Sequence, residues 1–242
     1  MKRLFDVTAA VGGLLVASPV LAVILFMIWL HDRRNPFYLP YRVGRGERQF
    51  RMVKLRTMVE GADKTGVSST STDDRRITAI GHFIRRYKLD ELTQLWNVLA
   101  GHMSLVGPRP NLKRETDRYT VEEKKLLMVR PGITDFSSIV FSDEGEILRG
   151  TADPDLAYDQ LIRPWKSRLG IFYVERQAFR LDVRLFLLTV LALVNRKAAL
   201  RRVQVLLREL GAPDSLVRVA GREGQLAPYP PPGMTEIVTS RV

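Results

Sequence analysis

The chain has 242 residues, of which 45% are hydrophobic, a formal charge of +12 at pH 7, and no cysteine. This length allows one folded domain with appendages. The lack of cysteine excludes disulfides, thiolate nucleophiles and cysteine-based metal sites. The three histidines are scattered and have no metal-ligand spacing, so any catalysis must rest on carboxylates and on lysine or arginine, with or without a hard cation.

The positive charge is concentrated in two segments. Residues 1–60 contain ten Lys or Arg against four Asp or Glu, and residues 163–210 contain eleven against three. Because these basic segments are also the most apolar ones, the pattern favours an anionic membrane surface, where each basic side chain contributes roughly 1 kcal/mol. Nucleic acid is the alternative partner for so basic a chain. No helix-turn-helix, zinc or RNA-binding signature accompanies the charge, so we expect no nucleic-acid partner.

An apolar run of 24 residues without charge extends from Val7 to Leu30. It is long enough to span a bilayer as one helix and too long for the apolar region of a signal peptide. Ser18-Pro19 lies near its midpoint. Pro19 removes a backbone donor and clashes with the preceding turn, whereas Ser18 can hydrogen-bond to the freed backbone, which makes a break tolerable in lipid.

Each arm of this run would be about 17 Å long as a helix, enough for one leaflet. Both flanks are basic, so the positive-inside rule does not choose an orientation. The residues alone leave two alternatives open. One is a single spanning helix, and the other is a re-entrant helix-break-helix over residues 1–34 that keeps both ends in the cytoplasm.

The next hundred residues predict short elements. Arg42 to Met58 is typical of a strand pair with a turn at Gly44-Arg45-Gly46, and Arg76 to Tyr87 has helical spacing of apolar residues. A second helix is expected from about Asp90, with Gly101 as its stop. Segment 104–110 is rich in turn residues, 121–128 predicts a charged helix, and 143–155 predicts an acidic loop.

Two helices are predicted near the end of the domain, over 181–194 and 199–210. The second has leucines and valine on one face and arginines on the other, which is typical of a helix in a membrane interface and equally of one packed on the core. Residues 211–242 are polar and rich in Pro and Gly, which predicts a flexible tail, with a proline-rich docking segment as the alternative. The expected fold is α+β, mainly α, with a re-entrant N-terminal membrane helix, amphipathic interfacial helices and a small β-hairpin around one catalytic domain over 35–210.

Adjacent carboxylates, Asp90 and Glu91, open the second predicted helix. The helix dipole and free backbone N–H groups at that end hold such groups ionised. Acidic residues are also ordinary in a first helical turn, and composition alone favours that interpretation.

Separated cations surround this pair in the sequence: Lys54, Arg56, Arg85 and Arg109. Arginine presents a planar fork suited to phosphate, and the prolines on either side of Arg109 restrict its backbone. A solvated arginine in a turn is the alternative. Carboxylates, a restrained arginine and basic strand residues beside a membrane segment fit phosphoryl transfer, which needs charge neutralisation and positioning.

Several ordered motifs cover roughly residues 1–195. They are residues 2–6, Ser18-Pro19, and residues 53–58, 89–99, 103–110 and 130–134. In this order they closely resemble the bacterial sugar transferases, also called monotopic polyprenyl-phosphate phosphoglycosyl transferases. Larger relatives carry additional N-terminal membrane helices, so the resemblance is to the compact catalytic form.

The resemblance implies a reaction that initiates bacterial surface glycan synthesis. A sugar 1-phosphate moves from a nucleotide sugar, UDP-linked by family habit, to polyprenyl (undecaprenyl) phosphate. In this scheme Asp90 is the nucleophile that forms a covalent phosphosugar, and Glu91 helps to hold Mg²⁺. Lys54, Arg85 and Arg109 match residues of the polar site, and we include Arg56 as a further substrate contact.

The resemblance also implies an anchor that re-enters the membrane, broken at Ser18-Pro19, on the cytoplasmic face of the bacterial inner membrane. Three departures from the family pattern accompany it. Thr93 replaces a common proline, residues 135–139 differ from the usual Gly-x-Ala-Gln-Val, and Gly170 stands where an aspartate is common. The last two put nucleotide or sugar contacts in doubt. The Gly170 departure motivates an alternative function, a catalytically inactive membrane partner of a glycan assembly pathway.

Overall fold

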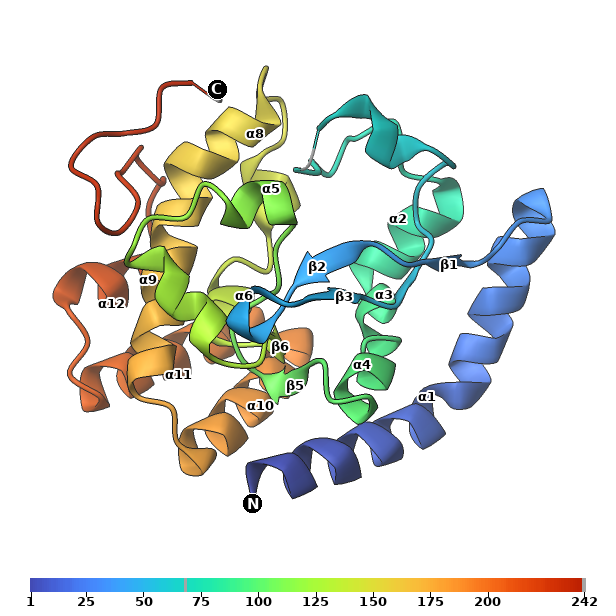
Figure 1. Ribbon diagram of the computed structural model, residues 1–242, viewed down its shortest axis with the longest axis horizontal. Helices are drawn as coiled ribbons and strands as arrows, with labels where there is room; N and C mark the ends of the chain where they lie inside the picture. Colours follow the sequence, from blue (N-terminus) through green and yellow to red (C-terminus); the bar gives the residue numbers. More distant parts are fainter. Residues whose placement is uncertain (68, 241–242) are drawn as a thin grey trace.

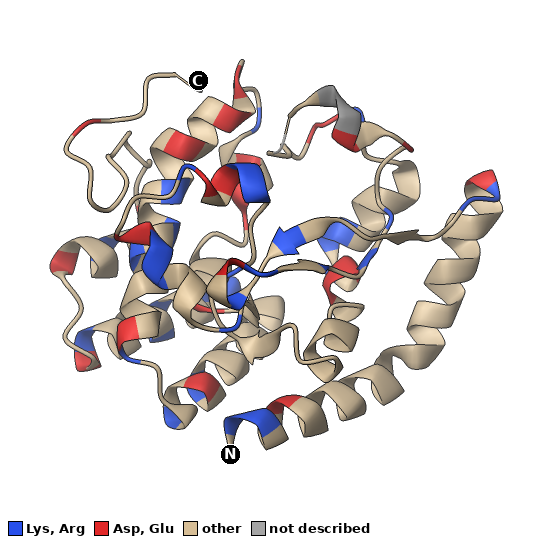
Figure 2. Cartoon of the chain, viewed as in Figure 1, with Lys and Arg blue, Asp and Glu red and all other residues tan. Residues whose placement is uncertain are grey.

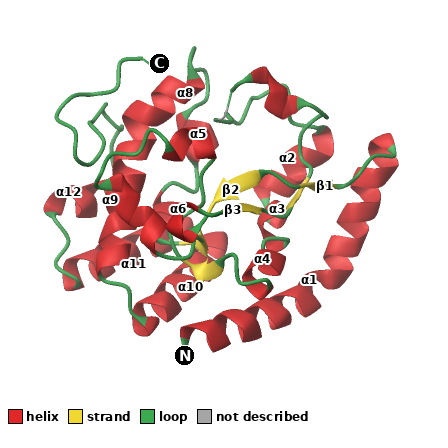
Figure 3. Ribbon diagram, viewed as in Figure 1, coloured by secondary structure: helices red, strands yellow, loops and turns green. Residues whose placement is uncertain are grey.

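The computed structural model describes residues 1–67 and 69–240 (Figure 1). The molecule is mainly helical with short strands (Figure 3), as the mainly α prediction required. Within the described residues the strands are β1 (Phe37–Tyr38), β2 (Tyr41–Val43), β3 (Gln49–Arg51), β4 (Lys54–Leu55), β5 (Ser104–Val106) and β6 (Gly132–Thr134). The α-helices are α1 (Lys2–Asp32), α2 (Ala79–Arg86), α3 (Leu89–Leu92), α4 (Leu95–Leu99), α5 (Lys113–Thr116), α6 (Phe136–Val140), α7 (Glu144–Ile147), α8 (Pro154–Ala157), α9 (Arg163–Glu175), α10 (Phe179–Val194), α11 (Arg196–Glu209) and α12 (Asp214–Gly221). Three 3-10 helices, Arg45–Glu47, Ala62–Thr65 and Glu123–Met128, and one π-helix, Tyr158–Ile162, connect them.

Helix α1 is continuous from Lys2 to Asp32 but bends near its middle (Figure 1). Pro19 lies at the bend and cannot donate to the carbonyl of Leu15. The hydroxyl of Ser18 donates to that carbonyl instead, at 2.8 Å, which satisfies the acceptor that the proline leaves open. The predicted break is therefore a bend within one helix.

Among the described residues, α1 is the one helix long and apolar enough to cross a membrane, and 22% of its most apolar window is buried. Figure 2 shows it free of charge between its two ends. The large apolar side chains left exposed along it, such as Leu15, Val16 and Phe26, require apolar surroundings.

Buried polar contacts fasten the first turns of α1 to the domain. Lys2 Nζ lies 2.7 Å from Asp182 Oδ2 in α10, and Arg3 donates to the carbonyls of Val98 and Leu99 at the end of α4. Asp6 is 2% exposed and accepts hydrogen bonds from β5. The start of α1 is thus part of the folded domain, and further along the helix Leu21, Ile24 and Ile28 are buried as well.

The predicted hairpin is present but shorter than predicted. β2 and β3 pair antiparallel, with Tyr41 opposite Arg51. Lys54 and Leu55 form β4, which pairs with β1 in a separate sheet. The structure adds a parallel pair, β5 and β6, where the sequence predicted only turns, because two three-residue strands carry too little pattern to be recognised.

The parallel pair depends on two glycines. A Cβ at Gly132 would lie 2.1 Å from the backbone nitrogen of Gly107, and a Cβ at Gly107 would lie 2.5 Å from the carbonyl oxygen of Arg130. Both distances are shorter than any real contact, so the two chain segments approach this closely only because neither residue has a side chain.

Helix α9 is largely buried and was not predicted. Nine of its thirteen residues are buried, and a helix buried on most sides lacks the one-sided apolar stripe on which prediction depends. Helix α11 was predicted correctly, but its apolar residues are buried against neighbouring helices, which supports the core-packed alternative over the interfacial one. These residues are Leu200, Val203, Leu206 and Leu207.

The folded part of the chain extends beyond the predicted boundary at residue 210. Helix α12 packs on α11 and buries Leu216 and Val217. Further on, the ring of Tyr229 stacks on Trp165 of α9 with centroids 4.6 Å apart. The stretch predicted as a tail therefore contains a packed helix and contacts α9, because its apolar and aromatic residues pack against the domain.

Candidate active site

Asp90 lies at the start of α3, after a tight turn from α2. Lys88, between the two helices, has a left-handed backbone with φ 56°, which costs an ordinary residue about 1–3 kcal/mol. This turn directs the side chain of Asp90 inward, where the residue is 6% exposed.

Lys54 is the direct partner of Asp90. Its Nζ lies 2.8 Å from Asp90 Oδ2, with the two side chains 18% and 8% exposed. Asn97 fixes the strand that carries Lys54, because its side chain accepts from the N–H of Val53 at 2.7 Å and donates to the carbonyl of Arg51 at 2.7 Å. Asn97 of α4 thus positions the strand that carries the cation, and the neighbouring helix α3 carries the acid.

Thr93 adds a third tether to the same strand. Its hydroxyl lies 3.1 Å from the carbonyl oxygen of Val53 and 3.1 Å from that of Asp90. A proline at this position has no such hydroxyl, so the departure from the family pattern supplies a contact instead of only removing one. Sequence reasoning missed this role of Thr93 and that of Asn97, although both lie within the matched motif.

The cations around Asp90 keep its carboxyl ionised. Burial acts to raise the pKa of Asp90, but the charge and hydrogen bond of Lys54, with the charges of Arg85 and Arg109, outweigh it and hold the pKa below its usual value. Burial also lowers the pKa of Lys54, an effect that the charge of Asp90 opposes. The site therefore holds an ionised carboxylate away from bulk water.

Arg85 reaches the site from α2. Its Nε donates to the hydroxyl of Thr57 at 2.9 Å, and burial lowers the pKa of its guanidinium while the charge of Asp90 opposes that shift. The helix can approach this closely because of Gly81, where a Cβ would lie 1.9 Å from the carbonyl oxygen of Thr57.

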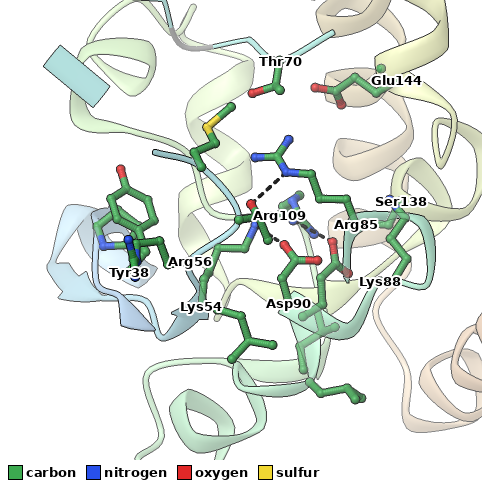
Figure 4. Close-up of a pocket in the computed structure, with 18 of the residues that line it drawn as sticks. Tyr38, Lys54, Arg56, Thr70, Arg85, Lys88, Asp90, Arg109, Ser138 and Glu144 are labelled. Carbon is green, nitrogen blue, oxygen red and sulfur yellow. Dashed lines mark hydrogen bonds and ion pairs between the residues drawn. The ribbon is translucent and has the colours of Figure 1, made fainter. Parts of the chain in front are cut away.

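Arg109 pairs with the other member of the acidic pair. Its Nη2 lies 2.8 Å from Glu91 Oε1, and the charge of Glu91 raises the pKa of the guanidinium. Arg109 follows Gly107-Pro108 directly. The close contact between Gly107 and Gly132 therefore fixes the position of its backbone. Figure 4 shows Lys54, Arg85 and Arg109 gathered around Asp90.

Arg56 is placed elsewhere. Its guanidinium binds Asp32 at the end of α1, with Nη2 2.7 Å from Oδ1, and its Nε donates to the carbonyl of Asn35. In Figure 4 it lies on the Tyr38 side of the opening, away from Asp90. The structure therefore brings together Lys54, Arg85, Asp90, Glu91 and Arg109, whereas Arg56 joins the end of α1 to the rim of the same cleft.

These residues line an open cleft of about 2070 Å³. Its opposite wall contributes Glu144, which forms an ion pair with Lys166 of α9. Burial acts to raise the pKa of Glu144, but the charge of Lys166 holds it below its usual value. Sequence reasoning missed both residues because the acidic segment was interpreted as a loop and α9 was not predicted.

The carboxylates suit a magnesium ion that is bound together with a phosphate. Among the described residues, no group of three or more His, Asp or Glu is arranged to hold a metal. Mg²⁺ commonly needs only one or two carboxylates, because substrate phosphates and water complete its coordination. The adjacent carboxylates of Asp90 and Glu91 at the floor of a cationic cleft match that pattern.

Comparison with known proteins agrees with this chemistry. Residues 1–196 match the model of the family described as bacterial sugar transferase. The UDP-galactose-lipid carrier transferase of Erwinia amylovora is 40% identical over 149 residues, which are 55% of this chain and 31% of that protein. The UDP-N-acetylgalactosamine-undecaprenyl-phosphate N-acetylgalactosaminephosphotransferase of Aeromonas hydrophila is 32% identical over 177 residues, 71% of this chain and 42% of that protein. The undecaprenyl-phosphate glucose phosphotransferase of Komagataeibacter xylinus is 34% identical over 200 residues, 78% of this chain and 35% of that protein. The chain thus spans less than half the length of each of these relatives.

Proposed function

Because this chain belongs to the bacterial sugar transferase family, we propose that it transfers a sugar 1-phosphate from a nucleotide sugar to a polyprenyl phosphate. The names of the relatives support undecaprenyl phosphate as the acceptor and a UDP-sugar as the donor. In this proposal the reaction initiates the synthesis of a bacterial surface glycan, at the cytoplasmic face of the inner membrane.

The observation that carries the proposal is the buried, ionised carboxylate of Asp90 among three cations. A carboxylate oxygen of Asp90 attacks the phosphorus that carries the sugar, and the bond from that phosphorus to the nucleoside monophosphate breaks. An oxygen of the polyprenyl phosphate then attacks the same phosphorus, forms the diphosphate and releases the carboxylate of Asp90. Splitting one transfer into two steps predicts ping-pong kinetics.

The neighbouring cations offset the repulsion between an anionic nucleophile and an anionic phosphate. Lys54 orients the carboxylate through Oδ2. Arg85 and Arg109 present guanidinium groups that match phosphate oxygens. All three are held by contacts with the protein before substrate binds, and such preorganised charge is the main source of rate enhancement in phosphoryl transfer.

Glu91, with Asp90, would hold Mg²⁺ in this proposal. The bound ion supplies charge neutralisation for the diphosphate of the donor. Arg109 keeps Glu91 oriented in the protein, because it pairs with one carboxylate oxygen, Oε1.

In this proposal α1 holds the site at the lipid surface. Asp32, the last residue of α1, binds Arg56 on the rim of the cleft, and the first turn of α1 is fastened to the domain as described above. Both ends of the apolar helix are therefore tied to the same body. This supports the re-entrant topology, with both ends on the cytoplasmic side, over a spanning helix.

The test is the substitution Asp90→Asn, with Asp117→Asn as the matched control on an exposed ion pair (Asp117 is 55% exposed). The release of nucleoside monophosphate from UDP-sugars, in the presence of undecaprenyl phosphate and Mg²⁺, should fall by at least about 10³-fold in Asp90→Asn and remain in the control. Release by the wild type excludes the inactive membrane partner. Full activity of Asp90→Asn would refute the proposed nucleophile.

A further inference from the structure

A second, smaller cavity adjoins the cleft that contains Asp90. Its volume is about 180 Å³, equivalent to roughly six water molecules, which is room for one sugar ring but not for a nucleotide. The cleft and the cavity share a wall, because both are lined by Arg42, Lys54, Arg109, Glu144 and Lys166. A ligand can therefore have one end at the catalytic cations and the other in the small cavity.

The shared wall is suited to an anion. Lys54 and Arg109 are already paired with the acidic residues of the catalytic site, but Arg42 Nε is buried and has no hydrogen-bond partner among the described residues. Burial and the neighbouring charge of Arg109 lower the pKa of Arg42 to about 10. A buried guanidinium N–H without an acceptor is costly, and a phosphate oxygen at the mouth of the cavity would satisfy it.

The interior of the cavity is polar but not strongly cationic. Asp135, at the start of α6, accepts from Ser138 N at 2.7 Å, from Ser138 Oγ at 2.8 Å and from Ser137 Oγ at 2.8 Å, all through Oδ1. Its other oxygen, Oδ2, accepts one longer hydrogen bond, from Ser137 at 3.0 Å. A carboxylate oxygen can accept more than one bond, so Oδ2 has remaining capacity.

Gly170 of α9 keeps the space in front of that oxygen open. A Cβ at Gly170 would lie 3.8 Å from Asp135 Oδ2 and 2.7 Å from Leu126 Cδ2. A side chain at this position would take up part of the cavity that Gly170 lines. The face of α9 at Gly170, which has no side chain there, and the carboxylate of Asp135 thus form one wall of the cavity. Such a wall suits a ligand with hydroxyl groups.

We propose that this small cavity binds the sugar ring of the donor, with the sugar phosphate at Arg42, Lys54 and Arg109 and with Asp135 Oδ2 accepting a hydrogen bond from a sugar hydroxyl. The inference rests on the proposed phosphosugar transfer and deepens it, because it assigns the residues that select the sugar. Asp135 and Gly170 are specificity-determining in this scheme, whereas Asp90 carries the chemistry.

The first test is Asp135→Asn. Asparagine caps a helix about as well as aspartate, so the hydrogen bond from Ser138 N is kept while Oδ2, the proposed acceptor, is replaced by an amide group that donates. Asp153→Asn is the matched control, because Asp153 caps α8 in the same way and lines neither hollow. The assay is release of UMP from UDP-glucose, UDP-galactose and UDP-N-acetylgalactosamine, the sugars named for relatives, with inhibition by added UMP as a second readout.

We expect Asp135→Asn to lower kcat/KM for the preferred sugar by about 10- to 100-fold, the effect of losing a hydrogen bond to a charged group, and to change the order of preference among the three donors. Inhibition by UMP should not change, since the nucleotide does not enter this cavity. Asp153→Asn should match the wild type in kcat/KM, in the order of preference among the three donors and in inhibition by UMP.

The second test is Gly170→Ala, which narrows the cavity, with Gly224→Ala as its control because a Cβ there meets no atom within 4 Å. The variant should discriminate more strongly against the bulkier N-acetylated sugar than the wild type does. An unchanged order of preference in both Asp135→Asn and Gly170→Ala would overturn the inference, as would a change in UMP inhibition, which would place the nucleotide in the cavity. A wild type that releases no UMP from any donor would instead refute the proposed function itself.

Discussion

Removing the charge of Lys54 should change the pH at which the enzyme works, and not only its rate. In Lys54→Met, the buried carboxylate of Asp90 loses the cation 2.8 Å away. Burial, which acts to raise the pKa of Asp90, is then opposed only by Arg85 and Arg109. The pKa of Asp90 must therefore rise, and the fraction of ionised nucleophile must fall as the solution becomes more acidic.

The size of the shift follows from the burial of the pair. With side chains only 18% and 8% exposed, the pair belongs to the buried class, in which removing one partner costs about 3–5 kcal/mol. Two other cations remain, so we take the lower figure. At 1.36 kcal/mol per pKa unit, the acid limb of the profile should move up by about two pH units.

The assay is kcat/KM for nucleoside monophosphate release, measured across the pH range in wild type, Lys54→Met and a control, Lys125→Met. Lys125 forms an exposed pair with Glu175, with both side chains nearly half exposed, and such pairs contribute little. A general loss of rate in Lys54→Met with no movement of the acid limb would refute the idea that Lys54 sets the ionisation of Asp90.

Three further predictions concern the scaffold, the membrane tether and the metal. Gly132→Ala should lower the free energy of unfolding by at least about 1–3 kcal/mol, because its Cβ would meet the backbone of Gly107; thermal unfolding measures this, and an unchanged Tm would contradict it. Arg56→Gln and Asp32→Asn should raise KM for polyprenyl phosphate to similar extents, with the double variant no worse than either single one; additive effects would show that the pair does not act as a unit. Removal of divalent cations with EDTA should abolish turnover, and added Mg²⁺ should restore it, whereas full activity in EDTA would exclude the ion from the reaction.

The candidate site was largely predictable from the sequence because its parts lie in contiguous motifs. Asp90 and Glu91 are adjacent, and Arg109 is marked by its flanking prolines. The sequence did not show in which direction each side chain points. Arg56 directly follows β4, two residues after Lys54, and yet it binds Asp32 at the end of α1.

The fold was less predictable where a helix is buried on most sides, because its sequence then lacks a regular alternation of apolar and polar residues. Helix α9 is enclosed on most sides, so its sequence shows no amphipathic period, and with it Lys166 and the position of Gly170 were missed. The apolar face of α11 fits a membrane interface and a protein core equally well. The packing of this face against α10 and α12 distinguishes the two.

The central claim is that phosphorus becomes covalently bonded to Asp90 during turnover, and intact-mass analysis of rapidly quenched enzyme tests it most directly. With a UDP-sugar and Mg²⁺ but no polyprenyl phosphate, the wild type should gain the mass of one phosphosugar, and fragmentation should place it on Asp90. Addition of the polyprenyl phosphate should remove it, and Asp90→Asn should never acquire it. Turnover by the wild type without any such adduct, under conditions that trap the first step, would contradict the mechanism.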